Sequence, residues 1–158
     1  MTEALPETSR QLQATLAGLG CRGRIRQLPD STHSANDAAA AIGCAIDAIA
    51  SSLLFMADDS PLLVMASGAH RVDTDRVAQL VGALKVRLAP AKTVAKITGQ
   101  VVGGVAPVGH PNPIRTLVDS TLEKWDEIWA AGGTPRTVFP LTFAELVRIT
   151  GGQVCEVA

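Results

Sequence analysis

Two apolar runs joined by a short polar turn constrain the fold of this chain more than any other feature. The runs are AIASSLLFMA (residues 48–57) and PLLVMASG (61–68), and the polar residues DDS stand between them, followed by Pro61. Apolar runs of this length bounded by turn residues are typical of buried strands, and Asp and Pro favour a tight turn. The sequence therefore predicts a central β-hairpin.

Short helices and further strands are expected on both sides of this hairpin. Amphipathic spacing, capping residues and terminal glycines predict helices over 7–19, 34–43, 71–82, 90–99 and 142–152. In the last of these, Thr142 followed three residues later by Glu145 is the pattern of a capping box. Short runs with strand character predict strands over 22–29, 85–89, 115–122, 126–133, 136–142 and 153–158.

Short helices scattered among many short strands indicate an α+β fold with a mixed sheet. The chain has 158 residues, of which 47% are hydrophobic, and this is enough to build the core of one domain. We therefore expect a single domain over residues 1–158.

Composition excludes several classes of function. Aromatic residues make up only 3% of the chain, so a row of rings on which nucleobases stack is not expected. The net charge of −1 argues against a broad basic face, and any nucleic-acid contact should be local. The three cysteines form no CxxC pair, and neither a signal segment nor a membrane-spanning run is found. A cytoplasmic protein without metal or organic cofactor is the expectation.

The most unusual stretch is QVVGGVAPVGHPNP, residues 100–113, which holds three glycines, three prolines and His110. Gly allows positive φ and close approach of a ligand, whereas Pro fixes φ and removes a donor. Such a loop is either the wall of a pocket that recognises its ligand through the main chain or a structural crossover between strands. The other histidines, His33 and His70, have no metal-ligand spacing to His110.

The order of these features resembles the YbaK/ProX family of aminoacyl-tRNA editing domains, which is related to the insertion domain of bacterial prolyl-tRNA synthetase. The resemblance rests on STHSANDAAAAIG, on the hairpin through SGAHRVD, on the Gly/Pro loop, and on WAAGGTPRTVFPLTFAELVRITGG. Within the loop, GGVAP matches the GxxxP element of the family from Gly103 to Pro107. These matches cover nearly the whole chain.

The resemblance implies a free-standing deacylase that hydrolyses the ester between a wrong amino acid and a tRNA. It implies a distorted, β-barrel-like mixed sheet flanked by helices, and no cofactor. The expected partner is the acceptor end of a mischarged tRNA, and an aminoacyl-tRNA synthetase is a further candidate. No membrane partner is expected. The sequence does not give the oligomeric state. A pocket lined by small residues and a rigid backbone would exclude large side chains and favour Ala, Ser, Thr or Cys esters.

Site residues are carried over by position. The candidate catalytic positions are Ser51, Gly103 and Gly104. The candidate substrate-binding positions are Ser52, Ser67, Gly68, Val105, Ala106, Pro107, Gly109, His110, Asp119 and Thr134. Several have a purely structural alternative: Ser67 and Gly68 turn the chain, Asp119 pairs with Arg115, and Thr134 caps a bend. A basic rim for the acceptor end, or a solvated helix face, is formed by Lys85, Arg87, Lys92, Lys96 and Arg115.

Ser51 departs from the family pattern, which has a lysine at this point of the first hairpin strand. A hydroxyl is short and neutral and cannot replace an ammonium group that holds phosphate or carbonyl oxygens. No His or Lys adjoins Ser51 in sequence to activate it as a nucleophile. The alternative function is therefore a catalytically weakened relative that binds aminoacyl-tRNA, or a small amino-acid-like ligand, without hydrolysis.

Overall fold

The structure is a computed structural model that describes residues 5–29 and 34–158. His33 and the start of the STHSAND stretch lie outside this range. In chain order the elements are α1 (Glu7–Gly18), β1 (Arg26–Gln27), α2 (Ala35–Ile42), η1 (Ile46–Ala48), β2 (Ile49–Ala57), β3 (Ser60–Ser67), α3 (Thr74–Val81), β4 (Val86–Leu88), α4 (Ala91–Thr98), β5 (Arg115–Asp119), η2 (Ser120–Lys124), β6 (Ile128–Ala131), β7 (Thr137–Leu141), α5 (Phe143–Thr150) and β8 (Gln153–Cys155).

The central hairpin is confirmed. Strands β2 and β3 pair antiparallel from Ala50 opposite Ser67 to Ala57 opposite Ser60. Asp58 in the turn has φ 54°, a left-handed conformation that Asp tolerates better than most residues. Its carboxylate accepts the N–H groups of Leu84 and Lys85 at 3.2 and 3.0 Å, so the turn is also fastened to the start of β4.

The described residues form one mixed sheet of eight strands in the order β1-β7-β6-β2-β3-β5-β8, with β4 paired to β2. Pairing is parallel between β2 and β6, β3 and β5, and β5 and β8, and antiparallel elsewhere. The expected α+β class and mixed sheet are therefore confirmed. The sheet is not closed into a barrel, because the end strands β1 and β8 pair only with β7 and β5.

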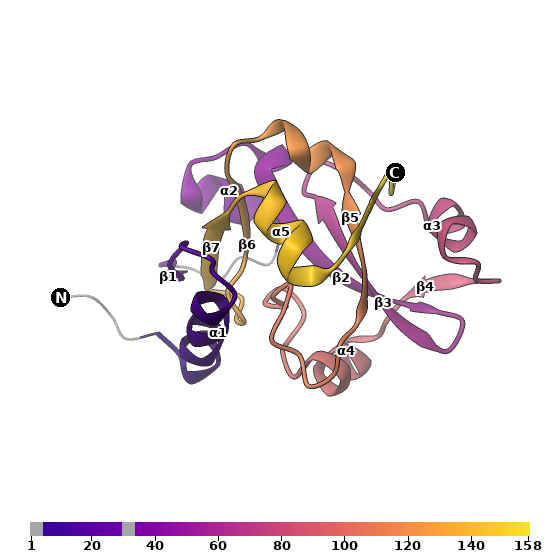
Figure 1. The fold of residues 1–158 in the computed structure, drawn as a ribbon, viewed down its shortest axis with the longest axis horizontal. Coiled ribbons are helices and arrows are strands. Elements are labelled where there is room, and N and C mark those ends of the chain that lie inside the picture. Colours follow the sequence, from indigo (N-terminus) through magenta and orange to yellow (C-terminus); the bar gives the residue numbers. More distant parts are fainter. Residues whose placement is uncertain (1–4, 30–33) are drawn as a thin grey trace.

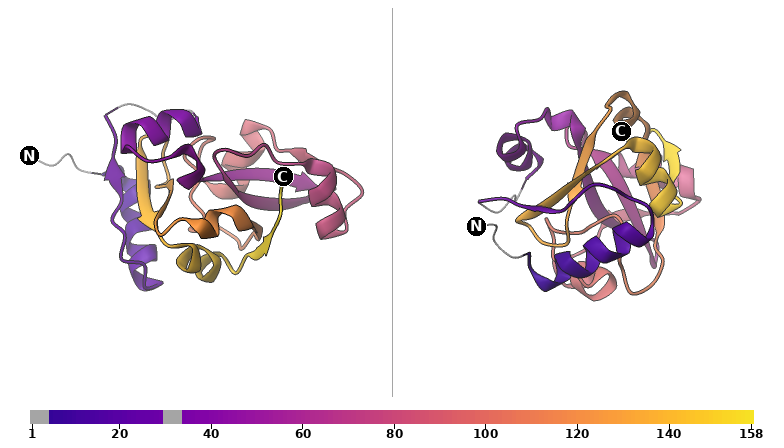
Figure 2. Two further views of the ribbon diagram at one scale, coloured as in Figure 1. Left: turned by 90° about the horizontal axis from the view of Figure 1, so that it is seen from above. Right: turned by 60° about the vertical axis from the view of Figure 1, so that its left-hand side comes forward.

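Helices cover both faces of the sheet (Figures 1 and 2). The largest core lies under α1 and α5, where Leu12, Leu16 and Leu146 pack against the strands. A smaller cluster on the opposite face packs α2 against Ile49 and Trp129, and α2 and α5 accordingly lie on opposite sides of the strands in Figure 2.

Local signals placed the helices accurately, whereas strand ends were less well predicted. Ser34 caps α2 at its predicted start, and Thr142 and Glu145 complete the expected capping box. Asp73, which lies inside the predicted range 71–82, caps α3. The strand predicted over 115–122 ends at Asp119, because the Asp119 side chain accepts the N–H of Thr121 and starts a 3₁₀ turn. In the segment predicted as a strand over 22–29, only Arg26 and Gln27 are in β1. The residues before Arg26 run beside Pro140 of β7, which has no N–H to donate, so the pairing does not extend there.

A buried carboxylate joins the ends of β3 and β5. Asp119 is fully buried, and its Oδ2 accepts the N–H of Ser67 at 3.0 Å and the Nδ1–H of His70 at 2.8 Å. Its Oδ1 accepts the N–H and the hydroxyl of Thr121 at 3.0 and 2.8 Å. Burial alone would raise the pKa of Asp119, but these hydrogen bonds outweigh it, so the pKa lies below its ordinary value.

Replacing this carboxylate should destabilise the protein in a pH-dependent way. We expect Asp119→Asn to lower the free energy of unfolding by about 1–3 kcal/mol near neutral pH, because hydrogen bonds to a buried charge are lost. A carboxyl with a lowered folded-state pKa stabilises the fold above its unfolded pKa of about 3.9, and this advantage fades as the pH falls further. Urea unfolding of both proteins between neutral and acid pH should show the difference shrinking. Asp126→Asn, at an exposed position, is the matched control, and an equal loss in both variants would contradict the account.

Candidate functional site

The edge of β2 is interrupted, and the principal cavity opens at the interruption. On one side β2 pairs with β3 along its length. On its other side it pairs with β6 at Ile49 and Ala50, and with β4 from Phe55 to Ala57. Among the described residues, 51–54 thus have a strand partner on one side only. A cavity of about 300 Å³ lies there.

The cavity is lined by β2 and by four segments that surround the gap. Its lining residues are Ser34, Ala35 and Ala38 of the α2 region, 49–54 of β2, Leu88, Ala89 and Val94 of β4 and α4, Val102, Gly103 and Val105 of the loop, and Trp129, Ala130, Ala131 and Val138 of β6 and β7. None of these side chains is ionisable. Only serine hydroxyls and the indole of Trp129 add polar side-chain atoms, so main-chain groups must supply most of the polar recognition.

Main-chain groups of β2 point into the gap. In an extended strand the N–H and C=O of one residue point to the same side, and those of the next residue to the other. The Leu54 carbonyl accepts the N–H of Ala89 at 2.9 Å, on the side of the gap. By this alternation the N–H and C=O of Ser52 face the same way. Its hydroxyl instead donates to Sδ of Met65 at 3.2 Å, so the main chain of Ser52, and not its side chain, is available to a ligand.

Part of the Gly/Pro loop contributes to the wall of this cavity. Gly103, with φ 88°, and Val105 line the cavity together with Ser51 and Ser52. Gly104 lies behind them, so close to the turn after β6 that a Cβ on it would be 2.5 Å from the Thr134 carbonyl carbon. Only glycine permits this approach of two backbones.

Two side chains hold the next residue of the loop. The N–H of Ala106 donates to Oε1 of Gln100 at 2.8 Å, and the Ala106 carbonyl accepts from Nε2 of His110 at 2.8 Å. Gln100 and Ala106 are both buried. Because both main-chain groups of Ala106 are occupied, the loop presents a fixed surface at Gly103 and Val105.

His110 and Gly109 lie at a different cavity from the one that holds Ser51. They line a hollow of about 340 Å³ together with Thr8, Gln11, Leu12 and Thr15 of α1. Burial lowers the pKa of His110, and the hydrogen bond to Ala106 offsets this only in part. Through its hydrogen bond to the Ala106 carbonyl, His110 holds the loop from the side of this second hollow. Pro107 and Ala106 are likewise buried and do not line the principal cavity.

Four other candidate residues support neighbouring elements outside the lining. The Ser67 hydroxyl donates to the Asp47 carbonyl at 3.0 Å, and a Cβ on Gly68 would be 2.7 Å from the Ile46 carbonyl oxygen. The Thr134 hydroxyl lies 2.8 Å from that of Thr137, across the bend that precedes β7. Asp119 holds the strand ends described above and does not pair with Arg115, whose Nη1 donates to the Val81 carbonyl at 3.4 Å.

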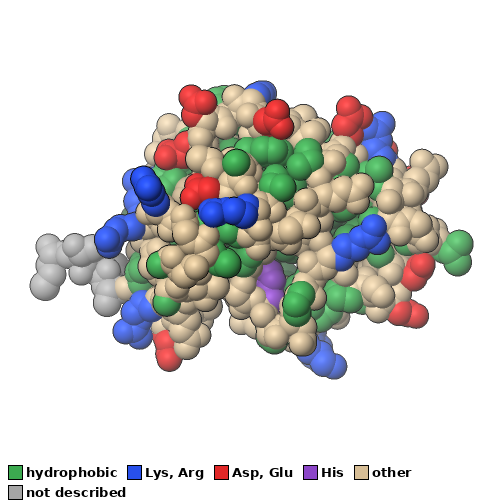
Figure 3. All heavy atoms as spheres, in the orientation of Figure 1, with side chains coloured by type: hydrophobic (Ala, Val, Ile, Leu, Met, Phe, Trp, Pro, Cys, Tyr) green, Lys and Arg blue, Asp and Glu red, His purple; other side chains and the backbone are tan. Residues whose placement is uncertain are grey.

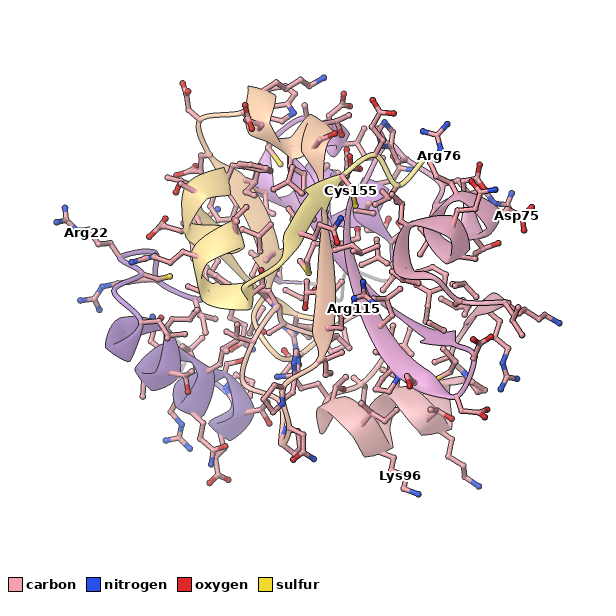
Figure 4. The ribbon with its side chains drawn as sticks, turned by 45° about the vertical axis from the view of Figure 1, so that its right-hand side comes forward. Arg22, Asp75, Arg76, Lys96, Arg115 and Cys155 are labelled. Atoms are coloured by element: carbon pink, nitrogen blue, oxygen red, sulfur yellow. The ribbon has the colours of Figure 1, made fainter. Side chains whose placement is uncertain are left out.

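The five residues of the expected basic rim are exposed but do not gather at one place. Lys85, Arg87, Lys92 and Lys96 belong to the segments of β4 and α4 that border the cavity. Arg115 is on β5, which is separated from β2 by β3. Figure 4 shows Lys96 and Arg115 on different parts of the surface.

Sequence reasoning missed the apolar residues of β6, β7, β4 and α4 that complete the cavity, and it missed Gln100. The signal for Gln100 was present, since a polar residue at the start of the Gly/Pro loop can bond its main chain.

Within residues 5–29 and 34–158 no cluster of His, Cys, Asp and Glu could hold a metal ion. No helix in the same part of the chain is long and apolar enough to cross a bilayer.

We expect Gly104→Ala to destabilise the protein by about 1–3 kcal/mol, because its Cβ meets backbone atoms that cannot move independently. The melting temperature should fall by roughly 2–10 °C for a chain of this length. Gly18→Ala is the matched control, because a Cβ there meets nothing within 4 Å. Equal melting temperatures for the two variants would contradict the close packing of the loop.

Comparisons with known proteins agree with this architecture. Residues 29–149 match the family described as "Aminoacyl-tRNA editing domain". A solved protein proposed as a trans-editing enzyme for prolyl-tRNA synthetase superposes with a TM-score of 0.91 at 37% identity, covering 98% of both chains. The uncharacterised protein YwhH of Bacillus subtilis is 28% identical over 131 residues, which are 82% of this chain and 83% of YwhH.

A second kind of relative is much longer. The proline–tRNA ligase of Nitratidesulfovibrio vulgaris (strain DP4) is 31% identical over 100 residues, which are 63% of this chain but only 17% of the ligase. The family match spans most of the chain, and the fold agrees with a solved relative over nearly all of it. The chain therefore belongs to the aminoacyl-tRNA editing domain family and has the YbaK-like fold that its sequence motifs indicated.

Proposed function

We propose that this protein is a free-standing deacylase that hydrolyses the ester of tRNA mischarged with a small amino acid. Membership of the editing-domain family and the similarity to a proposed trans-editing enzyme support the reaction class. The observation that carries the proposal is the cavity at the open edge of β2, where Ser51 and Ser52 face Gly103 and Val105.

Hydrolysis of this ester needs an attacking oxygen and a stabilised carbonyl oxygen. Water adds to the ester carbon, and the ribose oxygen of the tRNA leaves with a proton while the amino acid is released as the acid. Since no lining side chain is ionisable, we assign no general base to the described lining residues. The attacking water is instead activated by the substrate, whose neighbouring ribose hydroxyl accepts a proton from the water while it passes its own proton to the leaving ribose oxygen.

Main-chain groups are the donors that the site offers to the developing negative charge. The N–H of Ser52 faces the gap in β2, and the fixed loop at Gly103 forms the opposite wall. One preorganised donor of this kind contributes about 3 kcal/mol to transition-state stabilisation in hydrolases. We propose Gly103, with Gly104 behind it, as the loop positions that keep this wall in place for the scissile ester.

The remaining candidate residues support this pocket indirectly. Ala106, Pro107, Gly109 and His110 hold the loop, while Ser67, Gly68, Asp119 and Thr134 position the elements around it. We propose these residues as determinants of pocket shape and Ser51, Ser52 and Val105 as those that contact substrate.

Substrate size follows from the walls of the cavity. Alanines at 35, 38, 50, 89, 130 and 131 form much of the lining, and the β2 and β6 backbones beneath them are held in the sheet. A rigid wall converts each added methylene of the substrate into a clash. Esters of Ala, Ser, Thr or Cys are the proposed substrates.

A panel of mischarged tRNAs tests both reaction and size limit. We expect hydrolysis of at least one small amino-acid ester, and rates at least about tenfold lower for Phe and Trp esters. Ala131→Leu should slow the preferred reaction by filling the cavity, whereas Ala144→Leu, at an exposed position of α5, should not. Rapid hydrolysis of Phe- or Trp-tRNA would contradict the proposed size limit.

Substitutions at Ser51 test the role of the lysine that the family pattern has at this position. We expect Ser51→Lys to raise the deacylation rate about tenfold, equivalent to 1.4 kcal/mol, because it adds a cation to a cavity whose described lining has no charged side chain. Deacylation by the wild type, Ser51→Ala and Ser51→Lys should be compared on one substrate, with melting temperature as a control for the cost of a partly buried ammonium group.

The outcome also decides between hydrolysis and mere binding. A fast wild-type protein, inactive as Ser51→Ala and slower as a folded Ser51→Lys, would show that the serine has its own chemical role. Binding of aminoacyl-tRNA by the wild type without loss of its ester would favour the catalytically weakened alternative, for which the uncharged lining is the supporting observation.

A further inference from the structure

Three arginines alternate along the segment that leads into β1. Arg22, Arg24 and Arg26 are exposed, whereas Ile25 between the last two is buried in the main core. The amide side chain of Gln13 on α1 holds the segment in place: it accepts the N–H of Ile25 at 2.7 Å and donates to the Gly23 carbonyl at 3.2 Å. Alternation in an extended segment directs Arg24 and Arg26 away from Ile25 and places them about 6.6 Å apart. We call Arg22, Arg24 and Arg26 the arginine row.

The arginine row lies on the face of the sheet that holds the principal cavity. Arg26 is opposite Val138 in the pairing of β1 with β7, and Val138 is opposite Ala131 in the pairing of β7 with β6. Directly opposed residues share a face of the sheet. Because Val138 and Ala131 both line the cavity, this face continues from the cavity across β7 to Arg26.

Trp129 connects the two regions physically. Its ring lines the cavity, and the guanidinium carbon of Arg26 lies 4.5 Å from the ring centroid. This cation–π contact fixes the end of the row beside the cavity. Figure 4 shows the other end, where Arg22 projects away from the body of the protein.

The charges of the row are available to a ligand. Among the residues described, the guanidinium groups of Arg22 and Arg24 have no ion pair or hydrogen bond. Figure 3 shows several Lys and Arg side chains gathered at this end of the molecule, next to α1 and β1. A local basic strip of this kind is compatible with a net charge of −1 for the whole chain.

We propose that the arginine row binds the phosphates of the RNA strand whose 3′ end occupies the cavity. This inference rests on the proposed function and adds the path of the RNA. Arginine forms two parallel hydrogen bonds to a phosphate, and alternate residues of an extended segment are spaced much like successive phosphates of an extended strand. The RNA leaves the cavity past Trp129 and crosses β7 toward Arg22.

Binding of RNA that carries no amino acid tests this path independently of ester hydrolysis. The probe is a fluorescent RNA hairpin with a tRNA acceptor stem and a single-stranded CCA end, titrated by anisotropy over a series of NaCl concentrations. For Arg22→Gln/Arg24→Gln we expect about tenfold weaker binding at low salt. The slope of log K against log salt should fall by about 1.4, or roughly 0.7 for each lost contact with a single strand. Arg26 is left in place because it packs on Trp129.

The matched control is Arg71→Gln/Arg76→Gln, which removes the same charge from exposed positions at the start of α3, where Figure 4 shows Arg76 far from Arg22. It should bind the hairpin nearly as the wild type does. Unchanged binding by Arg22→Gln/Arg24→Gln, or a loss confined to the control variant, would overturn the proposed path and leave the function intact. Failure of the wild type to bind the hairpin in a salt-dependent way would instead contradict the function and the path together.

Discussion

The open edge of β2 between β6 and β4 is the feature on which the site depends. A central strand normally has partners along both sides, because unpaired main-chain groups in an interior are costly. Here the parallel contact with β6 ends at Ala50 and the antiparallel contact with β4 begins at Phe55. The main-chain N–H and C=O of Ser52 remain available to a ligand, and the cavity, the loop and α2 are arranged around them.

Buried polar groups keep this opening in one shape. Gln100 and His110 occupy both main-chain groups of Ala106, and Asp119 joins the ends of β3 and β5. A hydrogen-bonded buried group holds its neighbours precisely, since leaving it unpaired costs about 1–3 kcal/mol. Stability and recognition are therefore linked at these residues although none of them lines the principal cavity.

The charged side chains and the small-walled cavity lie in different parts of the molecule. The described lining of the cavity holds no ionisable side chain, while exposed arginines follow the same face of the sheet to its edge. A neutral, small-walled cavity discriminates by size, and a charged strip contributes affinity that depends on salt and little on sequence. This division is compatible with the proposed RNA-directed function in a chain whose net charge is −1.

The sequence by itself determined the hairpin, the helix starts at Ser34 and Thr142, and the family, because these depend on neighbours a few residues apart. Only the tertiary structure decided which residues share the cavity. Trp129 and Val138 reach it through the pairing of β6 and β7, whereas His110, close to Gly103 in sequence, turns to another hollow. Arg115 is on β5, and β3 separates it from β2 and the cavity. Strand order and register join segments remote in the chain, and no local pattern of residues encodes them.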